Sequence, residues 1–196
     1  MKKYIVLMAA ALVGTFSSCS VYTDVEAGGT AVEKMAGTWT VVVEQSVAEY
    51  RSFDGSSNDP DPDLLNLTEE QLDALVWEDI LGYGNQEVIT SNTAANIATE
   101  MWFVDNFWGA AFKCDVNYNA RTFSCAESEV YEGCNAYIKY GRITEDSVIT
   151  PSGRTADGIT AYVYYSDFGE YFGGYGLPFT MIKITGYRYT GYTEDL

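Results

Sequence analysis

The most reactive side chains in this 196-residue chain belong to four cysteines, and the chain has no histidine to activate them. Without histidine, neither a Ser-His-Asp triad nor a Cys-His pair can form, and the commonest zinc ligand is missing. Hydrolysis would instead need paired carboxylates, as in glycosidases. Asp and Glu together number 28, so such pairs arise by chance and none stands out by its spacing. We therefore assign no catalytic residue, no metal site and no cofactor.

Three of the cysteines, Cys114, Cys125 and Cys134, lie in one stretch of the chain. In an oxidising compartment three thiols predict one disulfide and one free thiol. Cys114 and Cys125 flank the turn-like residues 115–120 and could face each other across them. A Cys125–Cys134 bond is the alternative, and a third is that all three remain reduced as small buried apolar side chains. Their spacing fits neither a metal site nor a CxxC redox motif.

The fourth cysteine, Cys19, follows a short export-like segment. Lys2 and Lys3 form a basic start, and the apolar run 4–13 is too short to cross a hydrocarbon core of about 30 Å as a helix. Small and semi-polar residues at 14–18 precede the cysteine. This arrangement resembles a bacterial lipobox, in which the cysteine is acylated and becomes the mature N-terminus. The alternative is an ordinary secretory signal that is cut near the same position.

The lipobox divides the chain into a signal peptide (1–18), a flexible tether (19–35) and one β-rich domain (36–196). Acyl chains on the cysteine would hold the domain at a membrane, because each buried CH₂ contributes about 0.8 kcal/mol. Ser20 gives no inner-membrane retention signal, which favours the outer membrane. A formal net charge of −17 argues against nucleic acid and against electrostatic binding to anionic headgroups.

The composition of the domain is typical of strands. Sixteen Tyr, nine Phe and four Trp accompany many Thr and Val residues. Short β-patterned segments separated by turn signals predict an all-β protein, with an antiparallel barrel of about eight strands or a β-sandwich as the alternative. The expected strands are 38–45, 48–53, 86–90, 98–104, 110–117, 121–125, 136–143, 147–150, 159–165 and 179–189.

One segment, 54–85, departs from this pattern. It begins with an acidic loop rich in Pro, Gly and Ser, and Thr68 and Gln71 then form a capping box that starts a helix. The helix is expected over 69–81, because Leu72, Leu75, Val76 and Ile80 follow at helical spacing and Gly82 supplies a stop. It would either cover the mouth of a barrel as a lid or pack on the outside.

Two motifs resemble known families. The first expected strand opens with Gly37-Thr38-Trp39, which resembles the Gly-x-Trp start of lipocalin-like barrels. Those barrels place an arginine of the last strand against this tryptophan, and Arg188 lies in that strand here. The resemblance implies a pair, Trp39 and Arg188, in which a guanidinium stacks on the indole and closes one end of the barrel.

The C-terminal half resembles exported bacterial lipoproteins catalogued as lipid-binding putative hydrolases. The resemblance is carried by Pro151-Ser152-Gly153, by Asp157-Gly158-Ile159 and by the tail 186–195, which contains Gly-x-Arg-x-Thr-Gly and ends in Glu-Asp. A histidine often precedes the tail arginine in that family, whereas this chain has Tyr187. The resemblance implies lipid binding and one lipocalin-like domain, and it brings no catalytic residues with it.

We therefore expect a membrane-anchored lipoprotein that binds a lipid or another small hydrophobic ligand inside a β-barrel. The candidate lining residues are Trp102, Trp108, Tyr162 and Tyr164. The alternative is an interaction or structural lipoprotein with a solid core, whose loops bind a protein or a glycan. A hydrolase that works without histidine ranks third.

Overall fold

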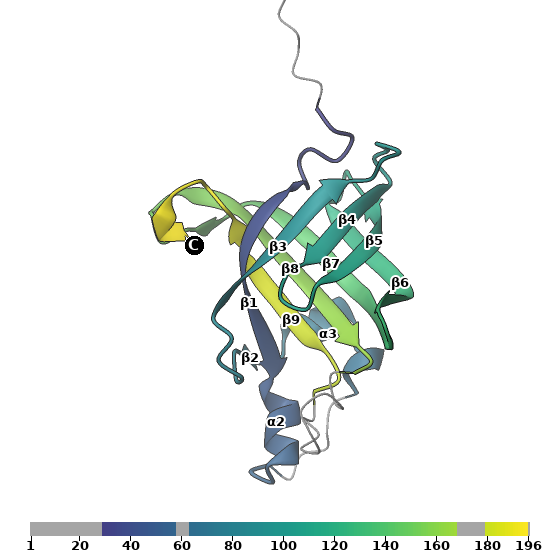
Figure 1. Cartoon of the computed structure of the whole chain (residues 1–196). Helices are drawn as coiled ribbons and strands as arrows, with labels where there is room; N and C mark the ends of the chain where they lie inside the picture. Colours follow the sequence, from purple (N-terminus) through teal and green to yellow (C-terminus); the bar gives the residue numbers. More distant parts are fainter. Residues whose placement is uncertain (1–28, 58–62, 168–178, 196) are drawn as a thin grey trace, which may run out of the picture.

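The computed structural model describes residues 29–57, 63–167 and 179–195. In this part of the chain one antiparallel sheet curls until its first long strand meets its last (Figure 1). β1 (Gly37–Ser46) pairs with β9 (Ile182–Arg188), from Trp39 opposite Arg188 to Gln45 opposite Ile182. This pairing closes the sheet, so the predicted lipocalin-like barrel is confirmed and the sandwich alternative is wrong.

Eight strands form the wall, and each pairs antiparallel with its neighbour. Between β1 and β9 they are β3 (Asn85–Asn92), β4 (Glu100–Asp105), β5 (Ala110–Asn117), β6 (Thr122–Tyr131), β7 (Cys134–Ile149) and β8 (Thr155–Tyr165). A two-residue strand, β2 (Trp77–Glu78), adds to the edge of β1. The segments expected as separate strands at 136–143 and 147–150 are one strand, β7, whose pairing with β8 shifts between Thr144 and Val148.

The core lies inside the barrel and follows the alternation of the strands. On β4, Met101 and Phe103 are fully buried while the intervening Trp102 is exposed. On β8, Ala161 and Val163 belong to the interior cluster, whereas Tyr162 between them belongs to a second cluster on the other face. The wall therefore has apolar side chains on both faces in the region of β8.

The folded part begins before Ala36, where the tether was expected to end. Residues 31–35 form turns, and the side chains of Val32 and Met35 are fully buried in the interior cluster. The backbone N–H of Ala31 donates to Asn96 Oδ1 at 2.9 Å and ties this segment to the β3–β4 connection. These residues cover one end of the barrel.

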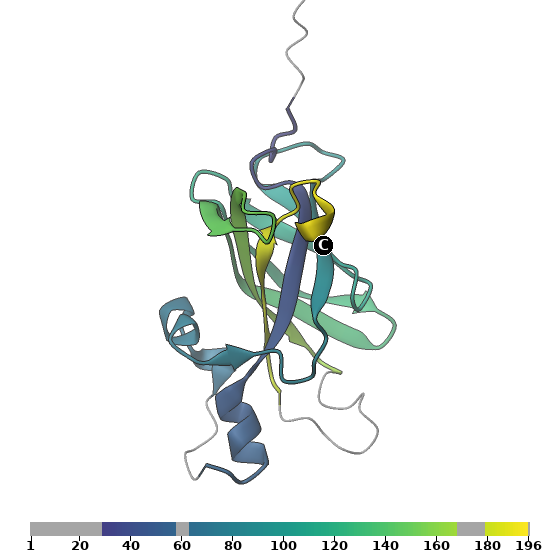
Figure 2. The same cartoon turned by 90° about the vertical axis from the view of Figure 1, so that its left-hand side faces the viewer.

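Residues 48–53, expected as a strand, form the helix α2 (Val47–Phe53) instead. Ser46 caps it, with its side-chain oxygen accepting from the backbone N–H of Glu49 at 3.4 Å. α2 projects from the end of the barrel opposite to the one where residues 29–36 enter (Figures 1 and 2). No helix among the described residues is long and apolar enough to cross a membrane.

The predicted capping box at Thr68 and Gln71 is confirmed, but the helix it starts, α3 (Glu69–Asp73), is short. The chain leaves the helix at Ala74 because Trp77 joins β2 and its indole N–H donates to the carbonyl of Leu72 at 2.8 Å. The expected extent to residue 81 is therefore wrong.

The insert packs on the outside of the barrel. Leu72 and Trp77, together with Leu64 of the short helix η1 (Leu64–Asn66), bury Tyr162 on the outer face of β8. Polar contacts hold it there, because Lys139 Nζ donates to the carbonyls of residues 65 and 67 at 2.6 Å each. Outside packing is therefore the position found for the helix, and the helix as a lid is wrong. Ile80, Leu81 and Tyr83, which follow β2, instead pack against the interior cluster.

Candidate functional site

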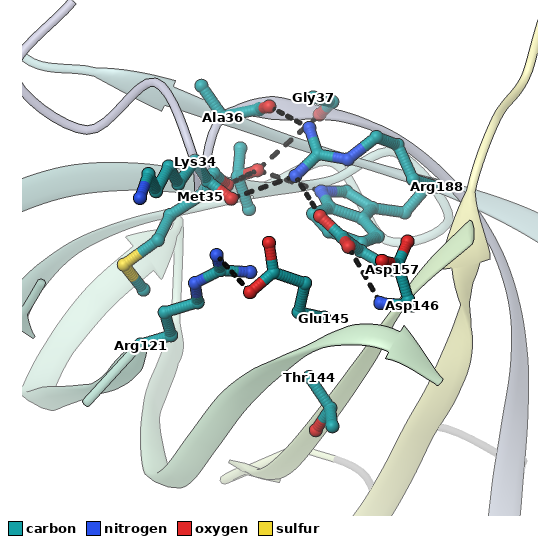
Figure 3. Close-up of polar contacts among 12 residues, drawn as sticks. Lys34, Met35, Ala36, Gly37, Arg121, Thr144, Glu145, Asp146, Asp157 and Arg188 are labelled. Carbon is teal, nitrogen blue, oxygen red and sulfur yellow. Dashed lines mark hydrogen bonds and ion pairs between the residues drawn. The ribbon is translucent and has the colours of Figure 1, made fainter. Parts of the chain in front are cut away.

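Arg188 closes the barrel end that receives the N-terminal segment. Its guanidinium lies over the Trp39 ring, 4.5 Å from the centroid, and donates to the carbonyls of Ala36 and Lys34, the latter at 2.9 Å (Figure 3). The Trp39 indole N–H is also used, since it donates to Thr90 Oγ1 at 2.8 Å. The pair expected from the lipocalin-like motif is thus in contact, and it joins the start of β1 to the end of β9.

A carboxylate completes the arrangement around Arg188. Asp157 Oδ2 lies 3.1 Å from the guanidinium, and its Oδ1 accepts from the backbone N–H of Asp146 at 3.0 Å (Figure 3). A separate ion pair, Arg121 with Glu145 at 2.9 Å, lies beside it. Both terminal nitrogens of Arg188 meet protein acceptors, so the arrangement fits a structural closure.

The tail motif forms a second tie at the same end of the barrel. Asp195, in the short helix η2 (Thr193–Asp195), is buried and accepts from the backbone N–H and the hydroxyl of Ser152, both at 2.8 Å, and from the hydroxyl of Thr190. Burial raises the pKa of Asp195, but these hydrogen bonds outweigh it and leave the pKa below its usual value. An acid of lowered pKa is a poor general base for the Ser152 hydroxyl, so this cluster also fits a structural role.

The described interior of the barrel is filled by its own side chains. Phe103 and Phe112 expose no surface, and their ring centroids lie 6.0 Å apart. Phe103 also contacts Phe123, and Phe112 contacts Tyr165, at 5.8 and 5.9 Å. A side chain that lined a hollow of ligand size would retain accessible surface. The described part of the barrel therefore has no room for a ligand between these rings.

The predicted lining residues do not come together inside the barrel. Trp102 points outward from β4 and is 37% exposed. Tyr162 and Tyr164 are on the outer face of β8, where Tyr162 is buried by the insert and Tyr164 stacks on Tyr137 at 5.0 Å. Their assignment to an interior cavity is wrong. Trp108 packs against the interior cluster, and its ring centroid lies 5.1 Å from that of Tyr165, so it contributes to the filled core.

A buried carboxyl, Asp105, lies near the α2 end of the barrel and was missed. Its Oδ2 accepts from the Tyr165 hydroxyl at 2.8 Å and its Oδ1 from the backbone N–H of Phe107 at 2.8 Å. Burial raises the pKa of Asp105, because the charged form loses its hydration. In the sequence, Asp105 differs from other acids only by starting the β4–β5 turn, a role that its bond to Phe107 satisfies.

Several grooves lie on the surface of the described residues, and two of them differ in the types of residue that line them. A groove of about 560 Å³ over β5, β6 and β7 has polar walls that include Glu69, Asp115 and Lys139. A groove of about 260 Å³ lies at the α2 end, and five of its seven lining residues have apolar side chains. Its lining residues are Val47, Ala48, Arg51, Ser57, Ala74, Leu75 and Val76. Arg51 is the one charged residue among them.

Cys114, Cys125 and Cys134 are free thiols in the structure, and all three are buried. Cys134 Sγ lies 3.1 Å from Asp167 Oδ1, which fits a thiol that donates to a carboxylate. Cys19 lies outside the described residues. The described residues also hold no group of three or more Cys, Asp or Glu that could bind a metal ion.

Comparison with known proteins places this barrel in a family. No curated protein matches the chain. One family model does match, over residues 24–193, and that range includes the Trp39–Arg188 closure and the outer insert. Its description is "lipid-binding putative hydrolase", and the closed β-barrel fits a lipid-binding protein. The match covers most of the sequence, and the chain therefore belongs to the lipid-binding putative hydrolase family.

Proposed function

We propose that this protein is a lipid-binding lipoprotein that holds the acyl chain of a single lipid in the groove between α2 and residues 74–76. Cys19 would carry the membrane anchor, and the domain would act from the outer membrane. Family membership supports lipid as the ligand class. The filled interior supports a site on the outside of the barrel, in place of the interior site expected from the sequence.

The observation that carries this assignment is the combination of an apolar groove with one cation. Leu75 and Val76 offer surface to an acyl chain, while Val47 lines the groove as a largely buried side chain. Each CH₂ that the groove buries contributes about 0.8 kcal/mol. Arg51 at the same groove can meet a carboxylate or phosphate headgroup. Val76 is 61% exposed and Phe53, at the end of α2, is 58% exposed, so the apolar surface continues beyond the groove.

The charge of the chain favours a single lipid molecule over an anionic bilayer. The net charge of −17 repels a negatively charged membrane surface, whereas one anionic headgroup beside Arg51 faces a local positive charge. The two sources of an acyl chain can therefore be separated by experiment. Monomeric lipid should bind, and vesicles with anionic headgroups should not.

The test uses the Cys19→Ser chain, which lacks the acylation site and is purified without detergent. Laurate below its micelle concentration and monolaurin, its uncharged counterpart, are titrated by calorimetry, and phosphatidylglycerol vesicles are tested by flotation. We expect laurate to bind more tightly than monolaurin. Arg51→Gln should weaken laurate binding at least fivefold, and Val76→Asp should weaken the binding of both ligands at least tenfold. Vesicles should not float the protein.

Matched controls lie elsewhere on the barrel. Ile149→Asp adds the same charge at a position that is 69% exposed on β7, and Lys113→Gln removes one positive charge from the outer face of β5. Both should bind laurate like the parent chain. Equal effects of Val76→Asp and Ile149→Asp would refute the groove, and flotation that depends on Val76 would assign the surface to a bilayer.

The anchor needs its own experiment. In a diderm bacterial host, the unaltered chain should yield an N-terminal peptide that begins at Cys19 and carries acyl chains, and it should fractionate with outer membranes. Cys19→Ser should appear in the soluble fraction. Cleavage near Ser18 without acylation would show the ordinary secretory alternative.

A further inference from the structure

The three buried thiols are not equivalent, because the strand register brings two of them together. β5 and β6 pair antiparallel, with Asp115 opposite Ser124 and Val116 opposite Phe123. Continuing this register by one residue places Cys114 opposite Cys125. Directly opposed residues in an antiparallel pair have Cα atoms about 4.5–5.5 Å apart, which is within the range that a disulfide spans. Both side chains point into the barrel.

The same register separates the other two pairings. On β7, Ile138 lies opposite Cys125 while Cys134 lies opposite Tyr131, four residues away. At roughly 3.3 Å per residue that offset is about 13 Å, well beyond the ~7 Å limit for a disulfide. Cys114 is on β5, and β6 lies between it and the strand of Cys134, so these two thiols are two strand spacings apart. Only one pair can be bridged without moving the wall.

We infer that Cys114 and Cys125 form the one disulfide of the exported protein, and that Cys134 remains a free thiol. This goes beyond lipid binding and does not rest on it. The bond would join β5 to β6 at the point where their regular pairing ends, just inside the lining of the larger outer groove. Cys134 instead keeps Asp167 as its partner.

The electrostatics of the pair suit thiol–disulfide exchange. The neighbouring thiol of Cys114 lowers the pKa of Cys125, and the same contact raises the pKa of Cys114. Cys125 is therefore the attacking thiolate. It attacks an external disulfide and expels one thiolate. Cys114, on losing its proton, then attacks the mixed disulfide at Cys125 and expels the second, so the external disulfide takes up the two electrons that the pair loses.

Burial dictates when this happens. Cys114 is 1% exposed and Cys125 is 6% exposed in the finished barrel, so an external disulfide has little access to either sulfur. The exchange is therefore expected during folding, once the β5–β6 hairpin has paired and before the barrel has closed. Oxidation during refolding should be at least tenfold faster than oxidation of the folded, reduced protein.

The experiment refolds the Cys19→Ser chain from a reduced, denatured state in a buffer of reduced and oxidised glutathione, followed by alkylation and digestion with trypsin and a Glu-specific protease. Cleavage after Lys113, Arg121 and Glu127 separates the three cysteines into different peptides. We expect the first two to be linked, with a mass loss of two hydrogens, and Cys134 to be alkylated.

Two variants give the control. Cys134→Ser should form the same link, and Cys114→Ser should leave its two remaining thiols open to alkylation. Circular dichroism verifies that each variant folds. Three alkylated thiols in the refolded parent chain, or a link between Cys125 and Cys134, would overturn the inference. Equal oxidation rates for folded and refolding protein would overturn the order of events.

Discussion

Replacing Arg188 by Met tests whether the closed end is held by the guanidinium. Methionine keeps the length of the aliphatic stem and its apolar contact with Trp39. The loss in free energy of unfolding therefore measures the contribution of the guanidinium. The cation–π contact is worth about 1 kcal/mol. The bonds to the carbonyls of Ala36 and Lys34 are worth about 1.5 kcal/mol each, because the donor is charged. The Asp157 ion pair adds roughly 0.5 kcal/mol at its partial exposure.

These contributions total about 4.5 kcal/mol. The Arg188 side chain is 27% exposed, so water can reach the groups that lose their partner, and its hydrogen bonds should offset about a third of this total. We therefore expect Arg188→Met to lower the free energy of unfolding by about 3 kcal/mol. With a urea m-value of roughly 2 kcal/mol/M, the midpoint should fall by about 1.5 M at unchanged m. Circular dichroism is the suitable probe, since the substitution itself alters the fluorescence of Trp39.

Lysine at the same position separates charge from shape. Arg188→Lys keeps the positive charge but loses the planar fork that reaches two carbonyls and a carboxylate, so it should recover less than half of the loss. Asp157→Asn combined with Arg188→Met should show coupling below about 1 kcal/mol, because the ion pair is the smallest contribution. A midpoint shift under about 0.3 M for Arg188→Met would refute the view that this residue closes the barrel.

Three further outcomes follow from the packing and the buried acids. A Cβ at Gly141 would lie 2.3 Å from the Phe123 ring, so Gly141→Ala should cost about 1–3 kcal/mol in urea unfolding, with partial recovery in combination with Phe123→Leu. The pKa of Asp105 is raised in the folded protein, so its contribution to the free energy of unfolding is complete below about pH 4 and is lost as the pH rises. As pH rises from acid to neutral, the free energy of unfolding of Asp105→Asn should therefore increase relative to that of the wild type. For Asp195→Asn, which removes an acid of lowered pKa, it should decrease relative to the wild type over the same range. Lys139→Met should speed amide hydrogen exchange in residues 64–73 at least tenfold relative to the β4 amides, because it frees the insert from the wall.

The barrel could be predicted because local patterns agree with the global fold. The segment 110–117 shows alternation, and the structure has β5 at those residues. The predicted contact of Trp39 with Arg188 also needed a family motif, since periodicity alone places no residue of the first strand against one of the last. What the sequence lacks here is long-range register, which is fixed by closure of the whole sheet.

The wrong predictions have specific causes. Residues 48–53 follow a β-branched run, but the Ser46 side chain caps a helix there and outweighs the continuing strand pattern. Tyr162 and Tyr164 were placed inside because aromatic residues occupy both faces of β8, so alternation could not identify the interior. The insert covers the outer face of the barrel at Tyr162, and the sequence of β8 itself does not indicate this contact.

Burial of Asp105 carries no sequence signal either. An acid at the start of a tight turn is common on protein surfaces, and its depth depends on Tyr165, which is far along the chain. The apolar groove at α2 was missed for a related reason. Val47 and Val76 meet only because the backbone N–H of the first donates to the carbonyl of the second at 3.1 Å.

The pairing of β1 with β9 makes the two ends of the domain depend on each other. Until residues 182–188 have been synthesised and delivered, β1 and β8 each present an unpaired edge, and such edges recruit other chains. Contacts between positions so distant in sequence form slowly, so this domain should be a slow folder with a vulnerable open intermediate. A C-terminal truncation that removes only the last strand would then be more damaging than its length suggests, because it opens the closed sheet and leaves β1 and β8 as two unpaired edge strands that promote aggregation.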